Sequence, residues 1–140
     1  MKGKVLAIDY GSKRVGFASG DLEMKITFPR EVVENKSHGF LVDWVEKFVD
    51  EWGVTMIVVG KPLNMEEGHQ ENPIMKAIEG FSSMLAKRFP ELEIIMFDER
   101  LSSFEADALM ARDGKGEKDR KQNRDAYAAQ VILERYFNSL

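Results

Sequence analysis

Three acidic residues stand where the ends of predicted secondary-structure elements could converge. Asp9 closes the first apolar run, Glu99 follows the last predicted strand, and Asp125 lies at the start of the last predicted helix. Open α/β sheets place their ligand sites at the carboxyl ends of strands. Carboxylates crowded together repel one another, so such a trio favours a hard divalent cation. The pattern therefore predicts an Mg²⁺ or Mn²⁺ site, and two such ions about 3.5–4 Å apart would suit phosphodiester hydrolysis.

Each of these carboxylates also has an ordinary structural explanation. Asp9, close before Gly11, could form an Asx turn at the end of its strand. Glu99 could form a surface ion pair with Arg100, and Asp125 could complement a helix dipole. For any one residue taken alone, the structural explanation is the commoner one.

The sequence lacks the residues of several other kinds of active site. It contains no cysteine, which excludes disulfides, thiolate zinc sites and cysteine nucleophiles. The two histidines, His38 and His69, fall in predicted loops or loop edges, which disfavours a histidine metal site. No Gly-x-Ser-x-Gly elbow or Gly-x-x-x-x-Gly-Lys-Ser/Thr phosphate loop occurs. Carboxylates remain as the candidate catalytic groups.

Length and composition predict one domain over residues 1–140. The chain has 140 residues, of which 44% are hydrophobic, enough for a core without a disulfide or structural metal. The formal net charge of −4 argues against a surface that binds nucleic acid everywhere, although basic residues cluster at 13–14 and 115–124. The short apolar run at the start fits neither a signal peptide nor a membrane span. We expect a soluble, cytoplasmic protein with no membrane partner.

The first third of the chain has the pattern of three antiparallel strands. Val5–Asp9 alternates, Val15–Ser19 returns after a turn at Gly11, and Ile26–Val33 adds a third strand. Proline lacks a backbone donor, so Pro29 requires this third strand to lie at an edge or bulge.

The remainder alternates helices with apolar strands. Helices are predicted over 41–52, 74–89, from Ser102 or Ser103 to Leu109, and over 126–137; strands are predicted over 54–60 and 94–97, with a turn at 61–62. The stretch 113–123 contains glycines and alternating charges without an apolar residue, which predicts a mobile loop. The element order predicts an α/β fold with a mixed five-stranded sheet, antiparallel in its first three strands and then parallel, with helices on both faces.

Four blocks of sequence together resemble one known family. They are IDYGSKRVGFA at 8–18, VVGKPLNM at 58–65, DERLSSFEA at 98–106 and DAYAAQVIL at 125–133. In order and spacing they resemble the YqgF-like family, which comprises pre-16S rRNA nucleases and Holliday-junction-resolvase-like proteins of the RNase H-like superfamily. The blocks extend over nearly the whole chain, and the predicted element order suits an RNase H-like fold.

The resemblance implies a metal-dependent nuclease. Its catalytic and metal-binding residues would be Asp9, Glu99 and Asp125, with Mg²⁺ or Mn²⁺ as the cofactor. Its substrate would be structured RNA in the 5′-end maturation of pre-16S rRNA during ribosome biogenesis, and ribosomal particles would be partners. The alternative substrate is branched DNA, as in a Holliday-junction resolvase of recombination and repair. Trimming an RNA end suits a monomer or a homodimer, whereas symmetric junction cleavage requires the dimer.

The resemblance also indicates residues that would contact nucleic acid. The candidates for phosphate contacts are Lys13, Arg14, Arg100, Lys118 and Arg124. The last two would belong to a mobile flap formed by the charged loop.

Some positions depart from the family pattern. Lys61 replaces a leucine, Ser102 and Ser103 replace a threonine pair, and Glu66 and Glu67 replace an Asp-Gly turn. The serines keep their hydroxyl groups and their capping ability. The added acidity would repel a phosphate backbone, so we expect the loop at 66–67 to face away from the substrate.

Two other functions compete with the nuclease. An Asp-x-Gly turn followed by a hairpin also occurs in actin-like or sugar-kinase-like ATPases, but those proteins need two such domains and this chain supplies one. A non-catalytic module that binds RNA or the ribosome would keep the same fold and carboxylates. Choosing between RNA and DNA requires contacts to the 2′-hydroxyl, which no motif reveals.

Overall fold

The computed structural model describes residues 3–62, 73–99, 108, 110–112 and 117–140, with the side chains at 62, 98, 99 and 117–122 excepted. In chain order the elements are β1 (Lys4–Tyr10), β2 (Arg14–Asp21), β3 (Ile26–Glu34), α1 (His38–Trp52), β4 (Val54–Pro62), α2 (Pro73–Arg88), β5 (Glu93–Glu99) and α4 (Glu117–Asn138). The three predicted hairpin strands, the helices that follow β3 and β4, and the two later strands are all present.

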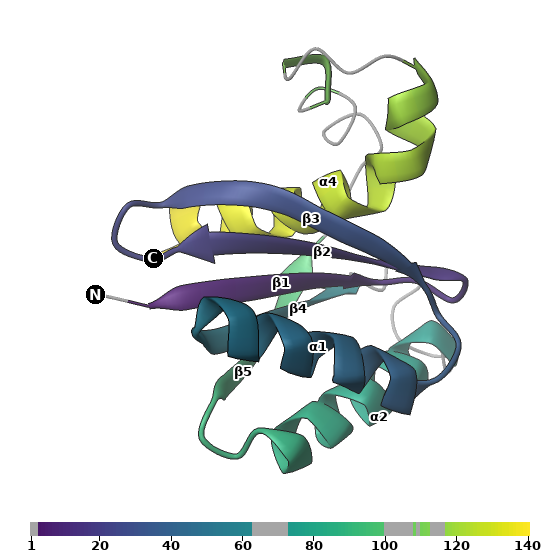
Figure 1. The fold of residues 1–140 in the computed structure, drawn as a ribbon, viewed down its shortest axis with the longest axis vertical. Coiled ribbons are helices and arrows are strands. Elements are labelled where there is room, and N and C mark those ends of the chain that lie inside the picture. Colours follow the sequence, from purple (N-terminus) through teal and green to yellow (C-terminus); the bar gives the residue numbers. More distant parts are fainter. Residues whose placement is uncertain (1–2, 63–72, 100–107, 109, 113–116) are drawn as a thin grey trace.

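The five strands form one mixed sheet in the order β3-β2-β1-β4-β5 (Figure 1). β1 pairs antiparallel with β2, and β2 with β3, whereas β4 runs parallel to both β1 and β5. This confirms the expected sheet. Pro29 lies in β3, which is an edge strand, where its missing N–H costs least.

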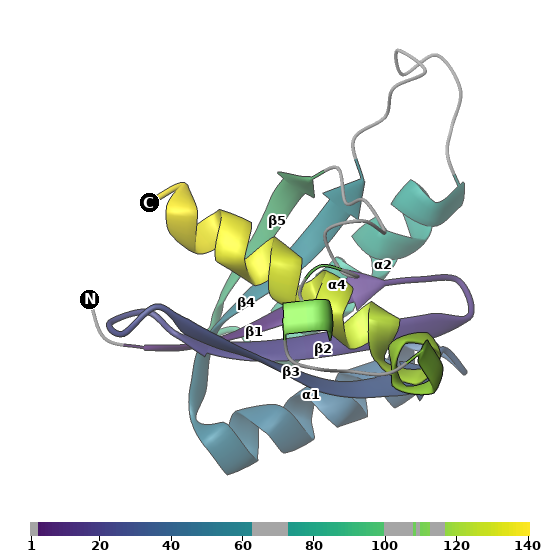
Figure 2. The same ribbon diagram turned by 90° about the horizontal axis from the view of Figure 1, so that it is seen from above.

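Helices cover both faces of the sheet, as expected. α1 and α2 lie on one face and α4 crosses the other (Figures 1 and 2). Alternation along β1 divides its side chains between two cores. Leu6 and Ile8 pack in the core under α1 and α2, whereas Val5 and Ala7 pack with Ile132 of α4. Every second residue of β1, counted from Val5, therefore faces α4.

Helix α1 begins at His38, before the predicted start at Leu41, and ends at Trp52 as predicted. The Ser37 hydroxyl accepts a hydrogen bond from the Phe40 N–H at 3.1 Å, which is the interaction of an N-cap. At the other end Gly53 adopts a left-handed conformation (φ 64°) and donates its N–H to the Val49 carbonyl. Both caps satisfy backbone groups that the helix leaves unpaired.

Strand β4 continues through the two residues predicted as a turn. Lys61 pairs with Asp98, and Pro62 pairs with Glu99 of β5. On its other side, β4 pairs with β1 only as far as Val59. Pro62 therefore lies beyond the pairing with β1, where a residue without an N–H is tolerated.

The prediction of a loop over 113–123 was wrong for residues 117–123, which begin helix α4. These residues are glutamate, lysine, aspartate, arginine, glutamine and asparagine, several of which have high helix propensity. Glu117 and Lys121 also stand four apart in the favourable orientation for an ion pair on a helix. A helix that projects beyond the core needs no apolar face, so the absence of apolar residues was a misleading signal.

The helix predicted from Ser102 or Ser103 lies mostly outside the described residues. Ala108 and residues 110–112 are helical, and Met110 is buried against Tyr127 and Val131 of α4. No helix in the described part of the chain is long and apolar enough to cross a bilayer.

We predict that Phe17→Ala lowers the free energy of unfolding by about 3–5 kcal/mol, because Phe17 is fully buried and packs edge to face on Phe48. Phe28→Ala on the neighbouring strand is the matched control. Phe28 is 49% exposed, so we expect a change of less than about 1 kcal/mol. Urea unfolding of the two variants would measure both values, and equal losses would contradict the assigned core.

Candidate acidic site at the end of β1

Asp9 is the penultimate residue of β1 and lies on the face covered by α4. Val5 and Ala7, four and two residues earlier, are buried in the core beneath this helix. The Asp9 residue itself is partly buried. Its carboxylate accepts no hydrogen bond from the described residues that follow it, so the Asx-turn explanation is not supported.

Asp125 is brought to Asp9 through Gly16. In the β1/β2 ladder, Gly16 is the direct partner of Asp9. A Cβ atom built on Gly16 would overlap the backbone carbonyl of Asp125. Only a residue without a side chain therefore allows α4 to lie this close to β2. The first sequence block, 8–18, thus supplies both Asp9 and the glycine that makes room for Asp125 beside it.

The prediction that Asp125 lies in the first turn of its helix was wrong, because α4 begins eight residues earlier at Glu117. At that depth the dipole of the helix end has faded, so dipole complementation does not explain this residue. Asp125 instead forms an ion pair with Arg14, the first residue of β2, with 2.8 Å between Nε and Oδ2. The two residues are 111 positions apart in the sequence.

The proximity of the two carboxylates changes the ionisation of one of them. Burial, and to a lesser extent the negative charge of Asp125, together raise the pKa of Asp9 from 3.8 to about 7. A bound cation would offset both the burial of Asp9 and its repulsion by the charge of Asp125. Oxygen donors of this kind are the ligands that Mg²⁺ and Mn²⁺ prefer, so the two side chains fit such an ion.

Glu99 reaches the same edge of the sheet by its backbone. It is the last residue of β5, and its pairing with Pro62 places it at the carboxyl end of the parallel strands, with β4 between it and β1. Its side chain lies outside the described part of the structure. Among the side chains that are described, no three His, Cys, Asp or Glu residues gather as metal ligands. The described part of the candidate site is thus the pair Asp9 and Asp125.

The predicted phosphate-binding residues fall into three groups. Lys13 and Arg14 are exposed beside the acidic pair, in the β1–β2 turn and at the start of β2. Arg124 is exposed on α4 next to Asp125. Lys118 lies on the helical part of α4, which corrects its assignment to a mobile loop, and Arg100 lies outside the described residues.

Asn35 is a residue of this region that the sequence did not indicate. Its side-chain Nδ2 donates a hydrogen bond to the Gly11 carbonyl at 2.8 Å, and its backbone N–H donates to the Lys13 carbonyl at 2.8 Å. These bonds hold the β1–β2 turn that carries Lys13. The only signal was an asparagine just after a strand, which is too common to assign a role.

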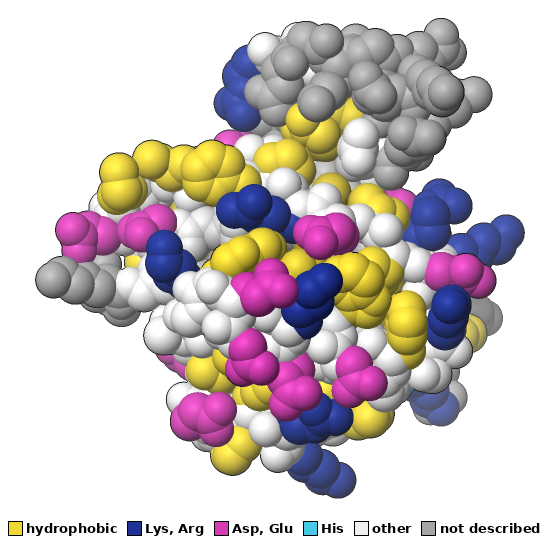
Figure 3. Space-filling model, in the orientation of Figure 1, with side chains coloured by type: hydrophobic (Ala, Val, Ile, Leu, Met, Phe, Trp, Pro, Cys, Tyr) yellow, Lys and Arg dark blue, Asp and Glu magenta, His cyan; other side chains and the backbone are white. Residues whose placement is uncertain are grey.

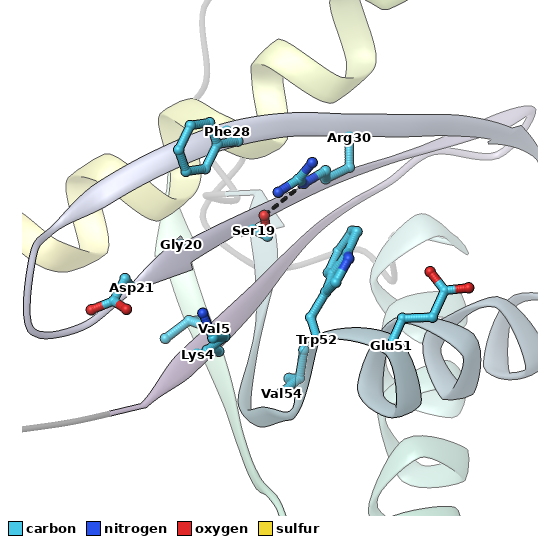
Figure 4. A pocket seen from close by; sticks show the side chains of 10 residues that line it. All are labelled: Lys4, Val5, Ser19, Gly20, Asp21, Phe28, Arg30, Glu51, Trp52 and Val54. Atoms are coloured by element: carbon cyan, nitrogen blue, oxygen red, sulfur yellow. Dashed lines mark hydrogen bonds between the residues drawn. The ribbon is translucent and has the colours of Figure 1, made fainter.

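A pocket of about 280 Å³ lies away from the acidic site, at the opposite end of β1 (Figure 4). Within it the Arg30 guanidinium lies 4.5 Å from the ring centre of Trp52 and 5.3 Å from that of Phe28. Arg30 also donates from Nε to the Ser19 hydroxyl at 2.7 Å. The arginine thus has structural partners in this pocket, and no second acidic cluster lines it.

We predict that Gly16→Ala separates Asp125 from Asp9, because the added methyl group must push α4 away from β2. The pKa of Asp9, followed by NMR, should fall as the charge of Asp125 recedes. Stability should drop by about 1–3 kcal/mol. Gly39→Ala is the control, because a Cβ there, in helix α1, would make only an ordinary van der Waals contact, 4.0 Å from the Ser37 Oγ. An unchanged pKa of Asp9 in Gly16→Ala would contradict this geometry.

We also predict that the protein loses stability as the pH rises from about 4 to 7. Over this range the unfolded chain ionises Asp9 while the folded protein keeps it protonated, so folding takes up a proton. Asp9→Asn removes this linkage and should be more stable than wild type at pH 8, by on the order of 2 kcal/mol. The two proteins should converge near pH 4. Thermal unfolding across the pH range tests this, and parallel curves would contradict the raised pKa.

Comparison with known proteins identifies the family of this chain. A family model, RuvX, described as Holliday junction resolvase, matches residues 3–139. A protein of Thiobacillus denitrificans named "Putative pre-16S rRNA nuclease" is 35% identical over 98% of this chain and 92% of its own length. A protein of the same name from Chlamydia pneumoniae is 34% identical over 96% of this chain and 89% of its own length.

Solved structures show the same fold at low sequence identity. Thermus thermophilus RuvC superposes with a TM-score of 0.62 at 15% identity, covering 97% of this chain and 95% of that one. The Fowlpox virus resolvase in complex with Holliday junction DNA has a TM-score of 0.62 at 11% identity, covering 99% and 98%. The RNase H-like fold expected from the sequence is confirmed. With the match over residues 3–139, the chain belongs to the RuvX family of Holliday junction resolvases, the YqgF-like family that its four sequence blocks resemble.

Proposed function

We propose that this protein is a divalent-metal-dependent nuclease that acts in the 5′-end maturation of pre-16S rRNA, with Asp9, Glu99 and Asp125 as its catalytic residues. One observation carries the proposal. Two carboxylates from opposite ends of the chain are held together at the carboxyl end of a parallel strand, and burial together with the charge of Asp125 raises the pKa of Asp9. A structural role alone would not favour such a repulsive pair.

The acidic residues would hold Mg²⁺ or Mn²⁺ through their carboxylate oxygens. A bound ion supplies an activated water and stabilises the leaving oxygen of a phosphodiester. In this role Asp9 acts from the rigid centre of the sheet, where β1 has a partner strand on each side. Asp125 acts from a helix whose backbone lies directly against Gly16 of β2.

The basic residues around the acids would bind the phosphate backbone. Lys13, Arg14 and Arg124 are exposed near the pair, and we assign Arg100 and Lys118 to the same surface from their sequence positions. A local basic rim of this kind attracts a polyanion in spite of the overall charge of −4. Phosphate contacts position a nucleic acid without reading its sequence, which suits a substrate recognised by structure.

The names of the relatives support RNA as the substrate. Relatives more than 30% identical over nearly their whole length carry the pre-16S rRNA nuclease name. We therefore infer ribosomal precursor particles as partners and the cytoplasm as the location. The second candidate is cleavage of branched DNA, because the matching family model is described as a Holliday junction resolvase and a resolvase of the same fold is bound to a junction.

We predict that Asp9→Asn, Glu99→Gln and Asp125→Asn each reduce cleavage by on the order of 100-fold or more, because each removes a metal-binding oxygen. The assay uses a labelled precursor RNA that carries the 5′ leader of 16S rRNA and a four-way DNA junction, each with Mg²⁺, with Mn²⁺ and with a chelator. Asp50→Asn is the control, because it removes the same charge from an exposed site on helix α1. Circular dichroism would verify folding.

The outcomes separate the candidate functions. Metal-dependent cleavage of RNA that fails in the three variants supports rRNA maturation, and preferential cleavage of the junction supports a resolvase. Binding of RNA without cleavage above the level of the variants would contradict both and indicate a non-catalytic module.

A further inference from the structure

Arg14 and the proposed metal would compete for the same carboxylate. The Nε of Arg14 lies 2.8 Å from Oδ2 of Asp125, one of the acids assigned above to metal binding. No ion pair to Asp9 occurs within the described part of the chain. The guanidinium thus neutralises one acid of the pair by direct contact and leaves the other without a direct charge partner there.

We propose that Arg14 couples the binding of nucleic acid to the binding of metal, by holding Asp125 in the free protein and releasing it when a phosphate group takes the guanidinium. This inference rests on the proposed function and adds to it a mechanism by which substrate prepares the site. Arg14 is a positioning residue in this scheme, because it acts on the reaction through Asp125.

The geometry allows the arginine to move without disturbing the fold. Its backbone is held in β2 by pairing with Glu34 of β3. Its side chain is 62% exposed, whereas that of Asp125 is 29% exposed. The guanidinium therefore approaches the carboxylate from the solvent side. It can rotate toward a phosphate in solvent while Asp125 stays against β2.

The strength of the contact suits a reversible exchange. An ion pair this exposed contributes about 0.2–1 kcal/mol, so a competing charge can displace it. A phosphate offers the guanidinium two parallel hydrogen bonds, which is the geometry that arginine prefers. Each phosphate contact made by Arg14 therefore frees an oxygen of Asp125, and by linkage a cation on Asp125 makes Arg14 available to phosphate.

The neighbouring basic residues are placed differently in the fold. Lys13 is exposed in the turn before β2 and forms no ion pair with a described residue. Arg124 directly precedes Asp125 on α4, and adjacent positions of a helix do not face each other. Arg14 comes from another element of the fold and forms an ion pair with Asp125 across 111 positions of sequence.

The test is a calorimetric titration of the full-length protein with Ca²⁺, with and without a saturating RNA hairpin. Ca²⁺ is a hard cation that takes oxygen ligands, and a gel run afterwards verifies that the RNA is intact. A titration of the RNA alone is subtracted. Wild type should bind Ca²⁺ more tightly when RNA is present. Without RNA, Arg14→Gln should bind Ca²⁺ about two- to fivefold more tightly than wild type. This factor corresponds to the upper part of the about 0.2–1 kcal/mol that an exposed ion pair contributes.

The decisive quantity is the gain in Ca²⁺ affinity that RNA produces. In Arg14→Gln this gain should shrink by the same two- to fivefold. Lys87→Gln is the control, because it removes a positive charge from an exposed site on α2, on the face of the sheet opposite α4; it should keep the wild-type gain. General attraction between RNA and Ca²⁺ would give equal gains in all three proteins.

Each outcome bears on a different claim. Equal gains in wild type and Arg14→Gln, or weaker Ca²⁺ binding by Arg14→Gln without RNA, would overturn the coupling and leave the metal site standing. Absence of Ca²⁺ binding by wild type and Arg14→Gln alike would overturn the metal site of the proposed function and this inference with it.

Discussion

The contact between the backbone of α4 and Gly16 of β2 is the constraint on which the acidic site depends. This contact sets how closely the last helix lies on the sheet, and the close approach brings Asp125 beside Asp9. Gly60 of β4 has a similar function further along, where a Cβ would meet the side chain of Ile132. Small residues beneath a helix lose contact area, and here the loss is offset by Ile132 and Leu133, which are fully buried in the core under α4.

The site itself is unfavourable for folding. Burial and the neighbouring charge both disfavour ionised Asp9, and the exposed guanidinium of Arg14 forms its ion pair with Asp125 rather than with Asp9. Such strain persists where the surrounding structure holds it in place, as the paired strands and the close helix do here. Of the large exposed apolar side chains among the described residues, three lie on the β2–β3 hairpin and the start of β3, at Met24, Ile26 and Phe28, and the others are Met84 and Leu140. Figure 3 shows apolar side chains gathered over this hairpin. The acidic edge is thus a polar feature of a fold whose exposed apolar surface is on another side.

Much of the architecture could be predicted, because the strands and the helices α1 and α2 bury regular apolar patterns. Helix α4 shows the limit of this approach. Its buried half carries a clear pattern, with Ala129, Ile132 and Leu133 fully enclosed, and was predicted. Residues 117–123 form the first part of α4, and their residue types have the helix propensity that an apolar pattern does not detect. The same error placed Asp125 at a helix end and suggested the wrong structural explanation for it.

The sequence by itself determined the strand and helix types, the family, and the identity of the acidic candidates, because these depend on local pattern and on motif residues. Only the tertiary structure decided which charges meet. Arg14 and Asp125 are 111 residues apart, and no spacing rule connects them. Their contact arises because Gly16 admits α4 against β2, so that the start of β2 and the middle of the last helix lie side by side. The raised pKa of Asp9 has the same origin, since burial and the charge of Asp125 exist only once the sheet and the helix are packed together.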